Sequence, residues 1–303
     1  MSIRDRINYI DNLKSSELSP DVIPNLFSVL YEGTPPDGKE GIVEIINKTD
    51  EFKRKFRSSY IRWALTINAL NVSQKYYSEH PDRGLGVGFL RVENKDFEMK
   101  NLVIMDASKA KENTNKCLDV ISAYGVFDLY GCFEEIIFDL YEIYLNFYPE
   151  KLIVGKDHKD ARALFRKRSE NDENRLAWNE YLSARVEKWR RKRVFDKMSE
   201  VFYAFVCDVG LKDNKHFSSH MTSMIKGINC ISELRNIITH GGDTVTETLA
   251  SFCDMGRNPM FPYKVGDRIS VDLFTLASTE YFFDSIITDI NRELMISMVG
   301  IEK

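Results

Sequence analysis

The chain has 303 residues, of which 43 % are hydrophobic and 12 % aromatic, and its formal net charge is −4. So apolar a composition excludes wholesale disorder, and the small net charge excludes a polycation made throughout for nucleic acid. No uninterrupted apolar run reaches roughly eighteen residues, so no transmembrane helix is predicted. Met1-Ser2-Ile3-Arg4 lacks the apolar run of a signal peptide, and five cysteines without a CxxC pair are typical of a reduced protein; we expect a cytoplasmic location.

Residues 1–105 are predicted to form a mostly helical N-terminal region, to which the sequence assigns no role. Ser19-Pro20 is a helix start signal, because serine suits the N-cap and proline the first helical position. Apolar residues predict a short helix at 42–46, and aromatic and aliphatic residues at helical spacing predict a long helix over about 49–79. His80-Pro81 ends that helix.

The segment after this helix predicts either a strand pair, at 87–92 and 102–105, or an irregular connector. Three glycines at alternate positions from Gly84 lack the GxGxxG spacing, and no lysine follows as in a P-loop, so we expect no nucleotide cofactor. His216 and His220 are four residues apart, as in some metal sites, but no third ligand lies near them in the sequence. We therefore expect no metal either.

Residues 106–303 are predicted to form a helical domain, which makes the whole chain mainly α. The most apolar helical pattern covers 116–148 and extends around much of the helix circumference, as in a helix at the centre of a bundle. A polar loop is predicted after residue 242. Further helices are predicted at 194–209, 217–240 and 272–298, and the sequence allows a small β-hairpin at 265–268.

A basic insertion at about 150–193 interrupts this domain. From Lys151 to Arg193, fourteen lysines and arginines stand against seven acids. Such an asymmetry is typical of a surface that binds an anionic polymer, although a solvated amphipathic helix carries the same pattern. Its densest part interleaves a tryptophan with cations, so both phosphate contacts and base stacking are open to it. The predicted substrate-binding residues are Lys188, Arg190, Arg191 and Arg193.

The segment that ends the 217–240 helix carries the strongest candidate for chemistry. Arg235, Asn236 and His240 lie within about one and a half helical turns of one another, and Gly241-Gly242 then stops the helix. At about 100° per residue, the amide and the imidazole lie one above the other and the guanidinium lies on the adjacent face. Two such helix ends meeting about a twofold axis would therefore bring two arginines and two histidines to one cleft.

These residue types suit the cleavage of RNA. The 2′-hydroxyl of RNA is the nucleophile, a histidine can take or give the proton near neutral pH, and an arginine can stabilise the charge of the transition state. A purely structural role remains open from the residues alone. In that case Arg235 pairs with Glu134 or Glu135 of the central helix, and His240 only caps the helix end.

The run Arg235-Asn236-Ile237-Ile238-Thr239-His240 resembles the Arg-x4–6-His signature of the HEPN superfamily, in which an asparagine often follows the arginine. The aromatic, acid-containing segment 124–135 is similar to the first helix of such domains. The resemblance covers roughly 110–300. It implies a bundle of four to five helices whose late helix carries the motif, and a homodimer that builds the site from two chains.

The resemblance implies a metal-independent endoribonuclease, in which His240 is the general acid and base, Arg235 stabilises the transition state and Asn236 orients the histidine. Many HEPN nucleases act as toxins or in anti-phage defence, so RNA and a neutralising or regulatory protein are the partners that it implies. The alternative is a non-catalytic HEPN-like module that binds nucleic acid or protein.

Overall fold

The computed structural model describes residues 28–93, 96–253 and 261–299. This part of the chain is 73 % helical when its 3-10 turns are included; it contains eight α-helices and a two-stranded antiparallel sheet. The predicted mainly α class is therefore confirmed, and the sheet is the strand pair that the sequence allowed after the helix at 49–79. The helix predicted after Ser19-Pro20 lies outside the described residues.

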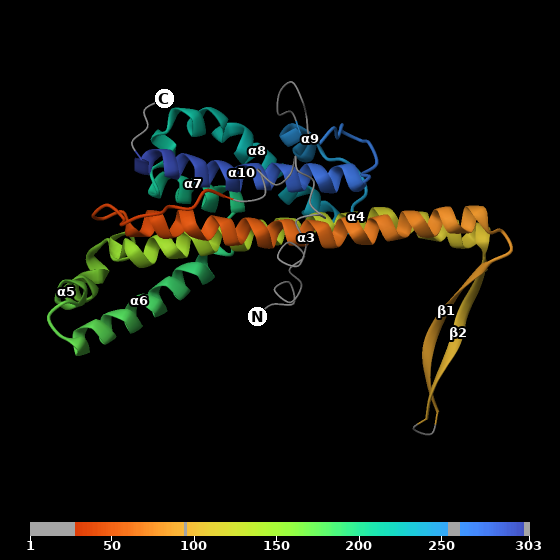
Figure 1. The fold of residues 1–303 in the computed structure, drawn as a ribbon, viewed down its shortest axis with the longest axis horizontal. Helices are drawn as coiled ribbons and strands as arrows, with labels where there is room; N and C mark the ends of the chain where they lie inside the picture. Colours follow the sequence, from red (N-terminus) through yellow and green to blue (C-terminus); the bar gives the residue numbers. More distant parts are fainter. Residues whose placement is uncertain (1–27, 94–95, 254–260, 300–303) are drawn as a thin grey trace.

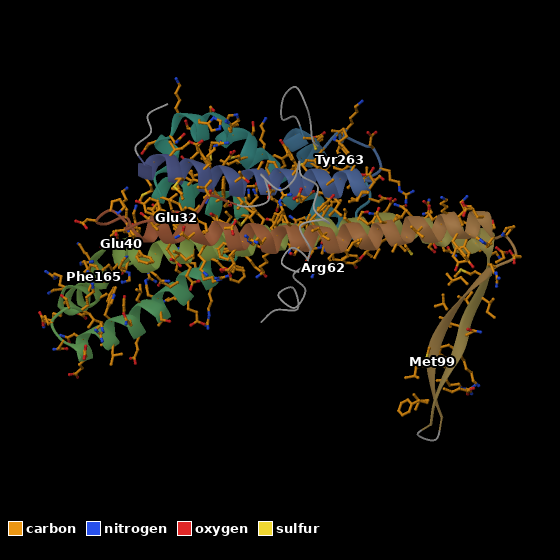
Figure 2. All side chains as sticks on the ribbon, viewed as in Figure 1. Glu32, Glu40, Arg62, Met99, Phe165 and Tyr263 are labelled. Carbon is orange, nitrogen blue, oxygen red and sulfur yellow. The ribbon has the colours of Figure 1, made fainter. Side chains whose placement is uncertain are left out.

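Two long helices form the backbone of the molecule (Figure 1). Helix α3 spans Glu40–Glu79 and helix α4 spans Ala107–Phe147, and they lie side by side and antiparallel over about 60 Å. Arg62 of α3, which Figure 2 labels, and the neighbouring Trp63 both donate hydrogen bonds to Asp128 of α4, at 2.9 and 2.8 Å. The predicted N-terminal region thus packs directly along the central helix of the predicted domain.

The first half of α3 corrects the prediction of two separate helices, at 42–46 and 49–79. The helix runs without a break from Glu40, because its polar residues near position 49 find partners. The Thr49 hydroxyl donates to the carbonyl of Ile46, and the amide of Asn291 donates to both Ile46 O and Thr49 Oγ1. These buried hydrogen bonds satisfy groups that would otherwise favour a helix end.

The remaining helices pack on the same side of α3 and α4 or at one end of them (Figure 1). Helix α10 runs along both long helices, and α7 and α8 cover the neighbouring surface of α4. Helices α5 and α6 form an antiparallel pair at one end. The bounds are Lys159–Lys167 for α5, Asp172–Arg193 for α6, Met198–Asp208 for α7, Lys215–Thr239 for α8, Glu247–Cys253 for α9 and Leu273–Val299 for α10, with 3-10 turns at Pro149–Leu152, Lys156–His158 and Leu211–Asp213.

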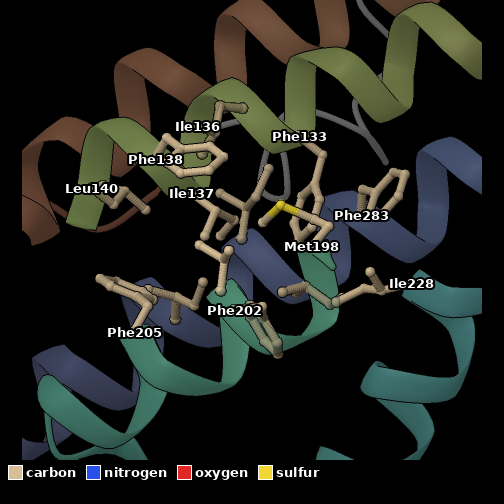
Figure 3. Close-up of a cluster of buried hydrophobic side chains, with 14 of the residues drawn as sticks. Phe133, Ile136, Ile137, Phe138, Leu140, Met198, Phe202, Phe205, Ile228 and Phe283 are labelled. Carbon is tan, nitrogen blue, oxygen red and sulfur yellow. The ribbon is translucent and has the colours of Figure 1, made fainter. Parts of the chain in front are cut away.

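Aromatic side chains dominate the core between α4, α7, α8 and α10 (Figure 3). Phe133 of α4 stacks on Phe283 of α10, with ring centroids 4.2 Å apart. Helix α8 approaches α10 closely through Gly227, where an added Cβ would lie 2.3 Å from the ring of Phe282. The 116–148 pattern therefore marks the central helix, as its apolar circumference predicts.

The strand pair is longer than the segments at 87–92 and 102–105. Strand β1 spans Gly84–Glu93, β2 spans Asp96–Asp106, and together they form a hairpin that projects from the end of the long helices (Figure 1). The small hairpin considered at 265–268 is instead a turn, whose neighbourhood holds a single bridge between Thr244 and Arg268. Part of the predicted polar loop after residue 242 folds into α9, where the Thr246 hydroxyl accepts from Leu249 N.

Candidate functional site

The end of α8 is held in a defined geometry. Gly241 has φ +78°, its N–H donates to Ile238 O at 3.1 Å, and Gly242 N–H donates to Ile237 O at 2.8 Å. This pair of bonds is the Schellman arrangement, which favours glycine at the left-handed position. His240 is the C-cap residue, and its N–H donates to Asn236 O at 3.0 Å while its side chain is exposed.

Arg235 reaches from α8 toward α4. Its guanidinium carbon lies 5.2 Å from the centroid of the Tyr130 ring, a cation–π distance. Burial raises the pKa of the Glu134 carboxyl, and the positive charge of Arg235 opposes that rise, so the two side chains are near one another. No ion pair ties Arg235 to an acid within the described parts of the chain, so the pairing with Glu134 or Glu135 that the sequence allowed is not formed as a direct contact.

Beside Arg235 lies a cleft of about 640 Å³. It is bounded by the first half of α4, the end of α8 and the segment 268–271. Arg235 and Arg268 contribute two cations to it, and Asp119 and Asp243 contribute two carboxylates. The rest of the lining is mostly apolar, and half of it comes from α4: Val120, Ala123, Tyr124, Phe127, Gly131, Ile238, Thr239, Gly242, Ile269 and Val271.

Arg268, Asp119 and Asp243 have no sequence signal that connects them to the motif. Asp119 lies on α4, and a short backbone ladder brings Asp243 and Arg268 together: Ile269 N–H donates to Asp243 O at 2.7 Å, and Val245 N–H donates to Asp267 O at 2.9 Å. Thr244 and Arg268 form an isolated antiparallel bridge between these bonds. The loop after the glycine pair is thus paired with a segment more than twenty residues further along the chain, and the pairing places a second arginine in the cleft.

The three motif residues do not share this cleft within one chain. Arg235 lines it, whereas Asn236 and His240 lie on the exposed surface of the helix end outside its lining. The separation follows from helix geometry, since Arg235 is about 100° from Asn236 around α8. One chain therefore presents the guanidinium inside the cleft and the imidazole beside it.

Most basic side chains named at the end of α6 make contacts within the chain. Arg190 donates to Asp139 and Glu142 of α4 at 2.8 and 2.9 Å, Arg191 pairs with Glu187, and Arg193 pairs with Asp196 at 2.8 Å. Trp189 packs against Tyr141, with centroids 4.8 Å apart, and against Phe138. The Trp189 ring therefore lies at the edge of the hydrophobic core and is not free to stack on a base. Lys188 is exposed to solvent.

Position along α4 separates these cations from the cleft. Arg190 contacts Asp139, nine residues beyond the Tyr130 that Arg235 covers. Nine residues correspond to about 13 Å along the helix and about 180° around it. Arg190 and Arg235 therefore contact different faces of the central helix.

The rings of His216 and His220 lie near the start of α8, with centroids 4.9 Å apart and planes tilted by 53°. Arg292 of α10 donates to His216 Nε2 at 2.7 Å and also to the buried Glu293 at 3.0 Å. Within the described residues, no group of three or more histidine, cysteine or acidic side chains has the arrangement of a metal site. None of the described helices is long and apolar enough to span a membrane.

No family model, no curated protein and no solved structure matches this chain. The HEPN resemblance therefore stays a prediction.

Proposed function

We propose that this protein is a metal-independent endoribonuclease of the HEPN type, acting as a cytoplasmic homodimer. The observation that carries the proposal is Arg235, which lines a cleft large enough for a nucleotide and has no ion-pair partner in the described chain, beside the exposed His240 at a fixed helix end. A role as a toxin or in anti-phage defence, under the control of a neutralising or regulatory protein, is part of the same proposal.

In the proposed reaction, the 2′-oxygen of the RNA attacks the adjacent phosphorus and the 5′-oxygen of the next nucleotide leaves. A neutral His240 accepts the proton of the 2′-hydroxyl, and a protonated histidine gives a proton to the leaving oxygen. Arg235 offsets the added negative charge on the phosphoryl oxygens, and Asn236 orients the imidazole. The products are a 2′,3′-cyclic phosphate and a 5′-hydroxyl, and no metal is required.

A second chain supplies the histidine that the cleft of a single chain lacks. Because Arg235 lies inside the cleft and His240 beside it, a twofold partner can place its own histidine over the guanidinium of the first chain. The two histidines then serve as acid and base.

A non-catalytic module that binds RNA is the second candidate, and one observation favours it. His240 is absent from the lining of the cleft, whereas Arg235 and Arg268 are both present. Two arginines next to apolar and aromatic walls suit a phosphate and a stacked base without any chemistry.

The test is incubation of the purified protein with transfer RNA or total RNA in EDTA, followed by analysis of the new ends. We expect 2′,3′-cyclic phosphates from the wild type and a loss of at least about 100-fold for Arg235→Ala or His240→Ala, the usual range for a lost acid or base. Both side chains are exposed, so the free energy of unfolding should change by no more than about 0.5 kcal/mol.

His220→Ala is the matched control, because His220 is an exposed histidine near the other end of the same helix. It should leave cleavage unchanged. A double variant of Arg235 and His240 that cuts RNA as well as the wild type would refute the nuclease. A mobility shift without cleavage, weakened by Arg235→Ala and Arg268→Ala, would select the binding module.

A further inference from the structure

A second groove adjoins the cleft beside Arg235. It has a volume of about 850 Å³ and lies where the start of α10 meets the two long helices (Figure 1). Four residues line both hollows: Asp119 and Val120 from α4, and Arg268 and Ile269 from the segment before α10. The two hollows therefore share a wall, and a chain-like ligand can pass from one into the other across Arg268. We call the second hollow the distal groove.

The distal groove contains a buried hydroxyl group without a partner. Ser122 of α4 lines the groove and is 1 % exposed, and its Oγ forms no hydrogen bond with the described residues. A helical serine or threonine commonly donates to the carbonyl four residues earlier, as Thr114 does to Ala110 O at 2.7 Å. Leaving a buried hydroxyl unpaired is unfavourable, so a ligand that reaches Ser122 and bonds to it is bound more tightly.

The other polar side chains of the distal groove include two amides. Asn71 of α3 makes no side-chain hydrogen bond within the described residues. Asn115 of α4 accepts from Gln74 at 3.1 Å through Oδ1, which leaves its amide hydrogens for a ligand. The apolar walls are formed by Ile67, Leu118, Val120, Ile269 and Leu273. Apolar walls with a few uncharged donors and acceptors suit a nucleobase, whose faces are apolar and whose edges carry donors and acceptors.

Two cations flank this lining. Arg268 has no ion-pair partner among the described residues. Lys116 pairs with Glu112 at 2.6 Å, but both side chains are about two-thirds exposed, so this pair is weak enough to give way to a phosphate. Of the two acids, Asp272 accepts from Thr275 N at 2.8 Å and so caps α10. The carboxylate of Asp119 on the shared wall can accept a hydrogen bond from a ribose hydroxyl or a base amino group.

We propose that the distal groove binds an unpaired base of the RNA, in the nucleotide next to the phosphate held by Arg235, and that Arg268 binds the phosphate between the two hollows. The inference rests on the proposed function and adds to it the selection of a base. A paired base cannot reach the buried Ser122, because RNA bases are read in this way only when they leave the helix.

This assignment gives the N-terminal region a role in substrate choice. Ile67 and Asn71 of α3 lie outside the segment that resembles HEPN domains, yet they form one wall of the distal groove. A free mononucleotide would occupy the distal groove alone. The wall that the groove shares with the cleft favours a polymer, because one RNA strand can then contact Arg235 and Arg268 together.

Binding of short RNA to the full chain tests the distal groove apart from cleavage. The His240→Ala variant in EDTA is titrated against fluorescein-labelled oligo(A), oligo(C) and oligo(U), and fluorescence anisotropy gives each Kd. We expect one base to bind at least about 10-fold more tightly than another. Ser122→Ala and Asn71→Ala, added singly, should each reduce that ratio about 2- to 10-fold, the usual effect of one lost hydrogen bond.

Asn68→Ala is the matched control, because Asn68 is an exposed asparagine of α3 three residues earlier and does not line the groove. It should leave the ratio unchanged. The Ser122 hydroxyl has no partner to lose and Asn71 is exposed, so all three variants should keep the parent melting temperature.

Equal Kd values for the three RNAs, or a ratio that Ser122→Ala and Asn71→Ala leave unchanged, would overturn the proposal. Two other results would also overturn it: a duplex that binds as tightly as the single strand, or AMP, CMP or UMP that binds and is not displaced by the oligonucleotide. Cleavage by the otherwise unaltered chain separates the two proposals. Base-selective binding that Asn71→Ala reduces, without any cleavage, supports the groove and refutes the nuclease. Cleavage whose base preference is the same in Asn71→Ala and Ser122→Ala refutes the groove and leaves the nuclease standing.

Discussion

A buried glutamate between α3 and α10 should make the stability of this protein depend on pH. Arg57 donates two hydrogen bonds to Asp284, at 3.1 and 2.7 Å, and lies 3.6 Å from Glu280. Within the described structure, Glu280 Oε1 is buried and has no hydrogen-bond donor. Burial raises the pKa of Glu280 to about 7 from its ordinary value of 4.5, and the charge of Arg57 limits the rise.

The size and sign of the effect follow from the two pKa values. The pKa of Glu280 is higher in the folded than in the unfolded state. As the pH rises, the unfolded chain therefore releases the proton of Glu280 at a lower pH than the folded chain does. The contribution of neutral Glu280 to stability is complete below about pH 4.5 and is lost as the pH rises through 7. At 1.36 kcal/mol per pH unit, the loss is about 3 kcal/mol.

Glu280→Gln isolates this contribution, because glutamine keeps the shape of the neutral acid and does not titrate. The free energy of unfolding in urea should fall in the wild type relative to the variant by about 3 kcal/mol between pH 4.5 and 7. Above pH 8 the difference should be constant, with the variant the more stable protein. Glu247→Gln, at an exposed position in the first turn of α9, should show no such slope.

A difference between the wild type and Glu280→Gln that does not change with pH would refute the raised pKa of Glu280. A wild type that gains stability over the variant between pH 4.5 and 7 would refute it as well. Either result would mean that Arg57 keeps Glu280 ionised in the folded state, so that burial is not the larger effect.

Two further predictions concern the packing of α8 and the basic end of α6. Gly227→Ala should lower the free energy of unfolding by about 1–3 kcal/mol, because its new methyl group meets the buried ring of Phe282, whereas Ser223→Ala on the exposed face of α8 should be nearly neutral. Arg190→Ala should cost about 1 kcal/mol by urea denaturation, since it removes two carboxylate contacts of a half-buried side chain. Lys188→Ala should leave stability unchanged and weaken an RNA mobility shift at low salt. Arg190→Ala that weakens RNA binding without loss of stability would contradict this assignment.

The sequence by itself determined the features that depend on neighbouring residues. Apolar residues at three-to-four spacing located α4, α8 and α10, because such spacing records which face of a helix is buried. The glycine pair after His240 located the end of α8, because the left-handed cap conformation favours glycine. The mainly α class followed from these local patterns.

Only the tertiary structure decided the contacts between distant segments. The short helix at 42–46 joins α3 because Asn291, far along the chain, satisfies its polar residues, and Arg268 enters the cleft through a backbone ladder to Asp243. The sequence shows the charge of Arg190, but it does not show that this charge pairs with the acids of α4. Periodicity and composition report that a side chain is buried or charged, and the partner that buries or neutralises it is fixed only when the whole chain packs.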